Sequence, residues 1–302
     1  EKHAARTLPT SYFHVVFTLP EQLRMLTLRN RWLVYDLLFR AAAASLIELA
    51  LDPRHLGAEV GVTAVLHTWS RELWYHPHVH CVVTGGGLTK TGDRWIPARR
   101  AGFFLPVRAV SAMFRGKFLA GLRRLQRAGA LDLAAPCDLT AEGLDDLLDD
   151  LQRRPWLVYA KRSFGGPEQL FNYLGRYTHR VGLANSRLLD VDERSVTFAT
   201  KLGRDVTLTP HEFIRRFLLH VLPKNFVRVR HYGLVASATL ATKYATAMRL
   251  LGSTLDPAQN HTARDEPPEQ QSTRNCPVCF FGVLVRHDLE PSAILDVWVP
   301  DP

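Results

Sequence analysis

A pair of histidines placed two residues apart on an apolar segment constrains this chain more than any other feature. His78 and His80 flank Val79, and the segment continues through apolar and β-branched residues to a glycine run at 85–87. This pattern predicts a strand that ends in a glycine turn. Because side chains alternate between the two faces of a strand, both imidazoles point the same way, about 6–7 Å apart along it, and can share one divalent metal ion.

A third ligand is expected from the preceding apolar segment, residues 62–69, which also predicts a strand and contains His67. Residues 70–77 connect the two segments, so the two strands are expected to pair as neighbours. His14, in an earlier apolar run, is the weaker candidate because it can equally pack within the sheet. The alternative interpretation of the histidine motif is a partly exposed polar face that binds no metal.

A pair of tyrosines, almost a hundred residues further on, is the second informative feature. It follows a Gly-Gly-Pro turn that is typical of a helix start. Tyr173 and Tyr177 are four residues apart, so both hydroxyls are expected on one face of that helix. Arg176, His179 and Arg180 accompany them, and these groups suit a site that faces phosphate. The plainer interpretation is a pair of core tyrosines with arginines on the solvated side.

Together these features resemble the HUH endonucleases with two catalytic tyrosines, and most closely the rolling-circle transposases of bacterial insertion sequences. The resemblance covers roughly residues 12–245. Its ordered blocks are Tyr12 to Pro20, Leu66 to Trp69, His76 to Gly87, Tyr159 to Arg162, Tyr173 to Arg180 and Phe213 to Tyr232. Relatives of this kind usually carry a cysteine-rich zinc-binding domain ahead of the first block. Since only 11 residues precede Tyr12, we expect that domain to be missing from this chain.

The resemblance implies an α+β fold in which helices pack on a central antiparallel sheet, of the ferredoxin-like Rep type, with a small C-terminal α/β extension. It also implies a metal-dependent single-stranded DNA endonuclease and strand transferase. His78, His80 and, as third ligand, His67 are expected to hold Mg or Mn. Tyr173 or Tyr177 is expected to attack the scissile phosphate, which gives a 5′-phosphotyrosine and a free 3′-OH.

Basic residues are the expected DNA contacts, and the partner is single-stranded or locally melted DNA at the transposon ends. The candidates are Lys161, Arg162, Arg176, His179, Arg180, Arg228 and Arg230. Arg228 and Arg230 alternate with apolar residues, as expected of a strand that follows a nucleic-acid backbone. A cationic amphipathic helix predicted over 110–125 is a second candidate DNA path. Trp69, Trp74 and Tyr75 either stack on unpaired bases or pack as core aromatics.

Composition agrees with a nucleic-acid partner. The chain has 38 Lys and Arg against 29 Asp and Glu, a formal net charge of +9, which suits a polyanion. Its 46% hydrophobic content excludes wholesale disorder. The longest apolar run, 41–51, is too short to cross a bilayer, and no signal peptide is visible, so we expect a bacterial cytoplasmic, nucleoid-associated protein with no membrane partner. Its oligomeric state is not specified by the sequence.

The expected organisation has five parts. These are an N-terminal tail (1–11), the catalytic domain (12–185), a hairpin and helix extension (186–250), a linker expected to be disordered (251–275) and a tail (276–302). In the tail, Cys276 and Cys279 look like half of a zinc site. Since a closed site needs four ligands and only His287 offers a third, a degenerate remnant is favoured over zinc binding.

Two other functions fit parts of the pattern. One is a catalytically inactive DNA-binding remnant of a transposase. The other is a non-haem iron or zinc hydrolase that uses the same histidines, in which case the tyrosine pair is incidental.

Overall fold

A computed structural model describes residues 6–98, 105–134, 137, 139–164, 183–200, 203–254, 274–275 and 283–284. For residues 161–164, 253–254 and the last two pairs, only the backbone is described. Contacts divide the chain into two units, Glu1–Thr254 and Leu255–Pro302. The second unit contributes a short strand pair, β11 (Arg274–Asn275) with β12 (Val283–Leu284).

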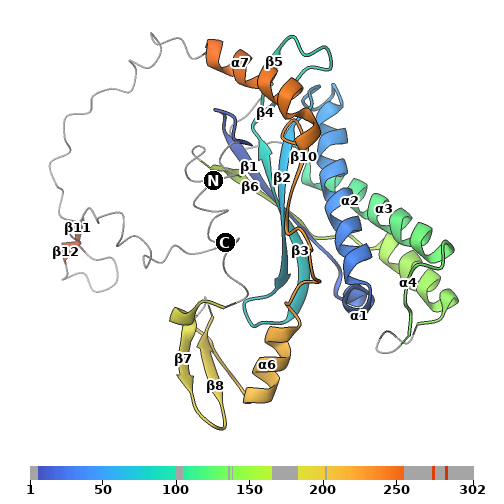
Figure 1. Ribbon diagram of the computed structural model, residues 1–302, viewed down its shortest axis with the longest axis vertical. Coiled ribbons are helices and arrows are strands. Elements are labelled where there is room, and N and C mark those ends of the chain that lie inside the picture. Colours follow the sequence, from blue (N-terminus) through green and yellow to red (C-terminus); the bar gives the residue numbers. More distant parts are fainter. Residues whose placement is uncertain are drawn as a thin grey trace. The chain divides into compact units, whose positions relative to one another are not determined.

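The centre of the first unit is a five-stranded sheet in which every neighbouring pair is antiparallel. Its spatial order is β10 (Val229–Gly233), β2 (Gly61–Trp69), β3 (Tyr75–Thr84), β1 (Tyr12–Thr18) and β6 (Val158–Phe164). The strands predicted around the histidine motif are confirmed, and they are direct neighbours. The mixed α and β class with an antiparallel sheet is therefore confirmed as well (Figure 1).

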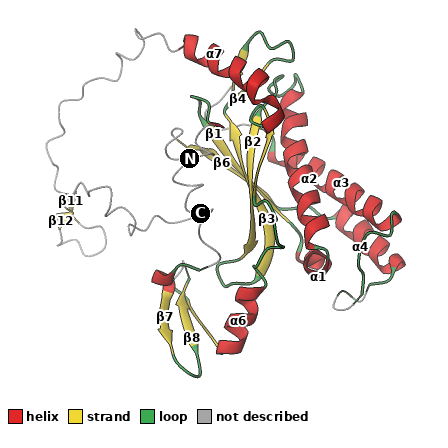
Figure 2. Cartoon of the chain, viewed as in Figure 1, coloured by secondary structure: helices red, strands yellow, loops and turns green. Residues whose placement is uncertain are grey.

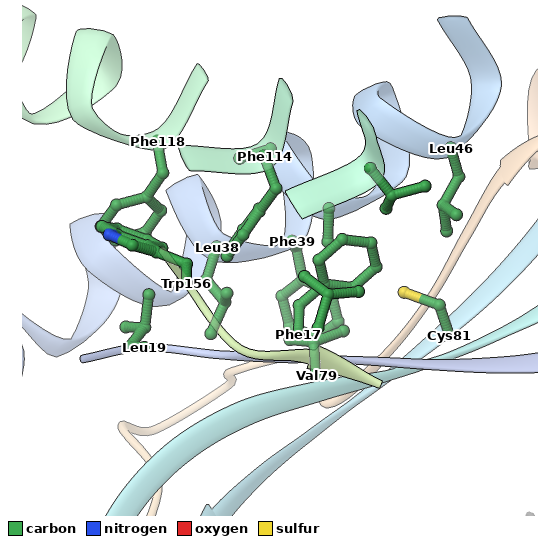
Figure 3. Close-up of a cluster of buried hydrophobic side chains, with 14 of the residues drawn as sticks. Phe17, Leu19, Leu38, Phe39, Leu46, Val79, Cys81, Phe114, Phe118 and Trp156 are labelled. Atoms are coloured by element: carbon green, nitrogen blue, oxygen red, sulfur yellow. The ribbon is translucent and has the colours of Figure 1, made fainter. Parts of the chain in front are cut away.

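Helices cover one face of this sheet, and Figure 2 shows them gathered on that side of the strands. They are α1 (Arg24–Arg29), α2 (Arg31–Leu51), α3 (Val107–Arg127) and α4 (Ala141–Arg153). The core lies between these helices and the sheet, with Phe17 and Val79 of the strands against Phe39 and Phe114 of the helices (Figure 3). Each of these four side chains is fully buried, and burying one stabilises the fold by about 1.5–3 kcal/mol.

The period of two along each strand separates the core from the opposite face of the sheet. On β3, Val79, Cys81 and Val83 belong to the core, so His78 and His80 point to the other face. Leu66 of β2 also belongs to the core, which places His67 on the histidine face. Histidines reach this face from three adjacent strands, and they include His14, His67, His76, His78 and His80.

The apolar periodicity that follows Pro20 and ends before Asp52 predicts one long helix, and this prediction is wrong at Asn30. A short 3-10 turn (Glu21–Leu23) precedes α1, and Asn30 separates α1 from α2 with φ −111° and ψ 41°. Its amide Nδ2 donates to the carbonyl oxygens of Leu26 (3.0 Å) and Asp132 (2.8 Å), and its Oδ1 accepts from the Asp132 N–H. These bonds tie the break to a loop more than a hundred residues away.

The polar character of residues 1–10 predicts a frayed end, and for the described residues from 6 onward this prediction is wrong. Leu8 is fully buried, and its backbone N–H and C=O both hydrogen-bond the Tyr12 hydroxyl, at 2.7 and 2.9 Å. Leu8 packs in a second, smaller cluster with Leu88, Leu234 and Leu251. Residues 6–12 are therefore part of the folded unit.

The remaining elements lie around the sheet. Two small sheets are present among the described residues of the first unit: β4 (Gly86–Leu88) pairs with β5 (Trp95–Pro97), and β7 (Leu188–Val191), β8 (Val196–Ala199) and β9 (Asp205–Leu208) form a three-stranded sheet. Further α-helices are α6 (Pro210–Leu218) and α7 (Ala245–Thr254). The short helical turns include two 3-10 turns, Asn185–Arg187 and Ser237–Thr239, and a π turn, Leu240–Tyr244. The sequence Thr-Pro-His-Glu at 209–212 predicts a helix start with Thr209 as its cap, and this is confirmed, with Thr209 Oγ1 accepting from the Glu212 N–H. After α6 the chain returns to the main sheet as β10, so residues 186–250 supply one of its edge strands.

No helix within the described residues is long and apolar enough to cross a membrane.

Candidate metal centre

Three histidines on the face opposite the helices form a group that could hold a metal ion. His67 comes from β2, and His78 and His80 come from β3; one ligand atom from each lies within 4.8 Å of the other two. The register of the sheet creates this group, because His67 lies directly across from His78. The ring centroid of His67 is 5.3 Å from that of His78 and 4.2 Å from that of His80.

The ring orientation of each β3 histidine is set by a contact at its Nδ1 atom. His78 Nδ1 lies 2.7 Å from the carbonyl oxygen of His76, to which it donates. His80 Nδ1 lies 2.8 Å from Nε2 of His14 on β1. Outer hydrogen bonds of this kind fix the tautomer of metal-binding histidines, leaving the second nitrogen to the ion. The residues present therefore fit a divalent cation.

Burial keeps the three imidazoles in the form that binds metal. Burial lowers the pKa of His78 to about 4, and it lowers the pKa values of His67 and His80 well below the ordinary value of 6.5. For His67 the neighbouring His78 and the Arg228 guanidinium lower the pKa further. All three rings are therefore neutral at pH 7, and a neutral imidazole has a lone pair to offer.

His14 does not belong to the three-histidine group, although the sequence makes it the weaker candidate ligand. Its ring is stacked on His80 with centroids 5.0 Å apart, and it is 2% exposed. It therefore lies behind His80, and the third member of the group is His67, as predicted.

A stack next to His67 was not foreseen from the sequence. The Trp69 indole lies parallel to the His67 ring, with centroids 4.9 Å apart, and the Arg228 guanidinium carbon lies 4.8 Å from the centroid of Trp69. Arg228 Nε also donates to the Leu66 carbonyl oxygen at 3.0 Å. This stack brings a cation next to the candidate metal ligands.

Comparison with known proteins identifies the family. A profile described as "Putative transposase" matches residues 61–242, more than half of the 302-residue chain. The chain is 45% identical to "Putative transposase y4qJ" of Sinorhizobium fredii over 302 aligned residues, which cover 94% of this chain and 75% of that protein. The chain belongs to this transposase family.

A second relative within the transposase group is the "Transposase for insertion sequence element IS801" of Pseudomonas savastanoi pv. phaseolicola. It is 30% identical over 233 residues, which cover 74% of this chain and 54% of that protein. The chain thus spans about half the length of this relative and about three quarters of the first. No solved structure matches the chain.

The sequence predicts that Arg228 and Arg230 lie on one face of a strand that follows the nucleic-acid backbone, but the two arginines have different neighbours. Arg228 lies over Trp69 beside the histidines, as described above. Arg230 instead forms an ion pair with Asp36 of α2 at 2.6 Å and lies over the Phe39 ring at 4.6 Å. The structure thus brings Arg228, but not Arg230, to the metal centre.

The basic face of α3, the second candidate DNA path, is largely engaged with the protein. Lys117 pairs with Glu48 at 2.6 Å, and Arg123 pairs with Asp149 of α4 at 2.7 Å. Arg115 donates to the Arg154 carbonyl oxygen at 2.7 Å. The basic side chains of α3 therefore help to hold α3 against α2 and α4.

Of the three aromatic residues considered for base stacking, Tyr75 is in the core. It is 2% exposed, and its hydroxyl lies 2.6 Å from that of Tyr35. Trp74 is 41% exposed, and the Arg216 guanidinium carbon lies 3.6 Å from its ring centroid. Trp69 is occupied by the stack with His67 and Arg228.

Several predicted residues lie outside the part of the chain whose side chains are described. These are Lys161, Arg162, Tyr173, Arg176, Tyr177, His179, Arg180, Cys276, Cys279 and His287. Lys161 and Arg162 are within β6, next to β1. The roles expected for all of these residues stay predictions.

Proposed function

We propose that this chain is a metal-dependent endonuclease and strand transferase that acts on single-stranded DNA in rolling-circle transposition. The observation that carries the proposal is the group of His67, His78 and His80, whose ligand atoms lie within 4.8 Å of one another. Membership of the transposase family supports a DNA substrate, and the net charge of +9 agrees with it. Such a substrate is met in the bacterial cytoplasm, at the nucleoid. We further propose that the five-stranded antiparallel sheet is the ferredoxin-like sheet of the HUH, Rep-type endonucleases.

The histidine group would hold one divalent ion, either Mg or Mn. Mg prefers a shell of oxygen ligands, so three imidazole nitrogens favour Mn of the two. When bound, such an ion supplies Lewis-acid polarisation of a non-bridging oxygen on the scissile phosphate. His67, His78 and His80 are the ligands in this proposal, and the His76 carbonyl oxygen holds the ring of His78.

Tyr173 and Tyr177 are the proposed nucleophiles. The phenol oxygen of one forms a bond to phosphorus as the bond from phosphorus to the 3′ oxygen breaks. The phenol proton is transferred overall to that leaving oxygen, which gives a 5′-phosphotyrosine and a free 3′-OH. A phenol has a pKa near 10, so a nearby base or cation must ease loss of its proton, and Arg176 and His179 are the proposed groups. A second tyrosine allows a second cleavage while the first cut end stays attached.

DNA binding is assigned to the basic residues around this centre. In the described part of the chain, Arg228 is the best supported of these residues, because its guanidinium lies over Trp69, which stacks on His67. Lys161, Arg162, Arg176, His179 and Arg180 complete the proposed set. Arg230 is the weakest member, because its charge is already paired with Asp36. Trp74, which is partly exposed, is the proposed stacking platform for an unpaired base.

We keep the division into a catalytic region (12–185), an extension that begins at residue 186, a linker that reaches residue 275 and a tail (276–302) as part of the proposal. The boundary between extension and linker moves from residue 250 to 254, because α7 runs to Thr254 and Leu251 is buried. The tail cysteines, Cys276 and Cys279, are assigned to a degenerate zinc site.

The two alternative functions make different demands on the histidine centre. An inactive DNA-binding remnant does not need three convergent imidazoles with oriented rings. A metal hydrolase needs the histidines but not the tyrosine pair. The coexistence of the oriented centre with the transposase family match favours the strand-transfer proposal over both.

The experiment that tests the proposal mixes the chain with Mn²⁺ and a single-stranded oligonucleotide that carries the end of the encoding element. A species that survives SDS and contains both protein and DNA is expected. Replacing both tyrosines (Tyr173→Phe with Tyr177→Phe) should abolish it, and His78→Ala should weaken it while DNA binding persists. An adduct that persists without both tyrosines refutes their assignment. Intact DNA binding with no adduct in any condition supports the inactive remnant.

A further inference from the structure

A fourth histidine, His14, lies behind the metal centre and contacts His80. His14 of β1 reaches the histidine face from the strand on the far side of β3 from His67. Its Nε2 lies 2.8 Å from His80 Nδ1, and the two rings are stacked with an interplanar angle of 15°. The side chain is 2% exposed, so its orientation is set by packing.

The nitrogen-to-nitrogen contact allows only one proton between the two rings. If His80 presents Nε2 to the ion, its own proton must sit on Nδ1, and this N–H then donates to His14 Nε2. If His14 Nε2 carried the hydrogen and donated it to His80 Nδ1, the single N–H of neutral His80 would be on its Nε2. That nitrogen would then have no lone pair for the ion. The tautomer of His14 therefore selects the tautomer of His80.

The neighbouring histidine shows the same arrangement with a different acceptor. His78 Nδ1 donates to the backbone carbonyl oxygen of His76 at 2.7 Å. A carbonyl oxygen can only accept, so it fixes one tautomer of His78 without help. The acceptor for His80 Nδ1 is instead a side chain, that of His14, and a single substitution can remove this acceptor.

We propose that His14 is a positioning residue for the metal centre: it accepts the Nδ1 hydrogen of His80 and so holds the His80 Nε2 lone pair toward the ion. This inference rests on the proposed metal site at His67, His78 and His80. It assigns His14 no contact with the ion, with DNA or with a reacting atom.

Two substitutions separate the hydrogen bond from the packing. His14→Phe keeps a ring of similar size in the stack but has no acceptor. His14→Gln places an amide oxygen near the position of Nε2, so it can accept the same bond. Val16→Ala is the matched control, because Val16 lies on the same face of β1, directly across from His80 in the register, and makes no such bond.

The measurement is the affinity of each purified chain for Mn²⁺, read from the electron paramagnetic resonance signal of the free ion during titration. His14→Phe is expected to bind Mn²⁺ about 10–100-fold more weakly than the natural chain. His14→Gln is expected to recover most of that loss, and Val16→Ala should bind as the natural chain does. Thermal unfolding in EDTA, expected to be similar for all four chains, reports whether folding is intact.

The outcomes distinguish this inference from the proposed function. If the natural chain binds Mn²⁺ and His14→Phe binds it equally well, His14 is not a positioning residue, and the metal site stands. If His14→Gln is as weak as His14→Phe while both are folded, packing rather than the hydrogen bond is responsible, and the inference is overturned. If the natural chain takes up no Mn²⁺, the proposed metal site fails and the inference fails with it.

Discussion

His67 of β2 and His78 of β3 are direct cross-strand partners, with ring centroids 5.3 Å apart. This one pairing brings the third histidine to the other two. Because side chains alternate along a strand, a register shift of one residue would send His67 into the helix-facing core and separate the group. The metal centre is therefore a direct consequence of how β2 pairs with β3.

Removal of a member of this pair should abolish tight metal binding without loss of DNA binding. His67→Ala and His78→Ala are each expected to weaken Mn²⁺ affinity by more than the roughly 10–100-fold typical of an outer-shell change. Titration with Mn²⁺ and fluorescence anisotropy with a single-stranded oligonucleotide measure the two properties. The control is His231→Gln, because His231 of β10 contacts Thr63 and is not in the group. Equal Mn²⁺ affinity in His67→Ala and the natural chain would remove His67 from the site.

The different neighbours of Arg228 and Arg230 predict different effects of the same substitution. Arg228→Gln should lower affinity for single-stranded DNA about tenfold and reduce the slope of log affinity against log salt by about 0.7. Arg230→Gln should change that slope much less than Arg228→Gln does. It should instead reduce the free energy of unfolding by about 1–2 kcal/mol, since it breaks the pair with Asp36. Binding measured at several salt concentrations, with urea unfolding, checks both. If the salt dependence of DNA affinity fell in Arg230→Gln but not in Arg228→Gln, Arg230 rather than Arg228 would be the DNA contact.

Trp74 is expected to contribute to DNA binding through its exposed ring. Trp74→Ala should weaken binding of single-stranded DNA by about 1–3 kcal/mol, the usual worth of one base stacked on an aromatic side chain. Trp32→Ala is the control, because Trp32 of α2 is 48% exposed but packs against Phe226 on the helix side of the sheet. Anisotropy titration measures both affinities, and equal losses in the two variants would argue against a specific role for Trp74.

His220 should make the fold sensitive to mild acid. It is 2% exposed between Thr68 and the Leu73 carbonyl oxygen, and burial lowers its pKa from the ordinary value of 6.5 to about 4, with Arg31 lowering it further. Between these two pKa values the unfolded chain binds more protons than the folded one. Its contribution to stability is therefore complete above pH 6.5 and is lost as the pH falls toward 4.

At pH 5 this loss amounts to about 2 kcal/mol relative to pH 8. His220→Gln should therefore show a smaller difference between the free energies of unfolding at pH 8 and pH 5, measured with urea. The exposed His211 provides the control, and His211→Gln should follow the natural chain. An unchanged pH dependence in His220→Gln would show that this histidine does not cause the acid sensitivity.

The sequence was sufficient for features that depend on local periodicity. Alternation around His78 and His80 predicted the strand and the shared face, and the short connection from 70 to 77 predicted that His67 would be close. The Thr209 and Pro210 pattern likewise predicted the start of α6. Each of these features is decided within about 20 residues of sequence.

Features that depend on distant partners could not be predicted. Asn30 interrupts an otherwise helical pattern because its amide bonds the backbone of Asp132. His14 contacts His80 only because β1 pairs with the other side of β3, and Arg230 turns to α2 because Asp36 is there. In each case the deciding partner lies tens to hundreds of residues away, and no spacing rule connects the two positions.

The central claim, that a tyrosine of this chain becomes covalently attached to cut DNA beside the histidine centre, is tested most directly by locating the attachment. The adduct formed with Mn²⁺ and the single-stranded element end is digested with protease and nuclease, and the nucleotide-bearing peptide is sequenced by mass spectrometry. The account predicts a 5′-linked nucleotide on Tyr173 or Tyr177, absent when His67, His78 and His80 are replaced together. Attachment to any other residue, or the same adduct without the three histidines, would contradict it.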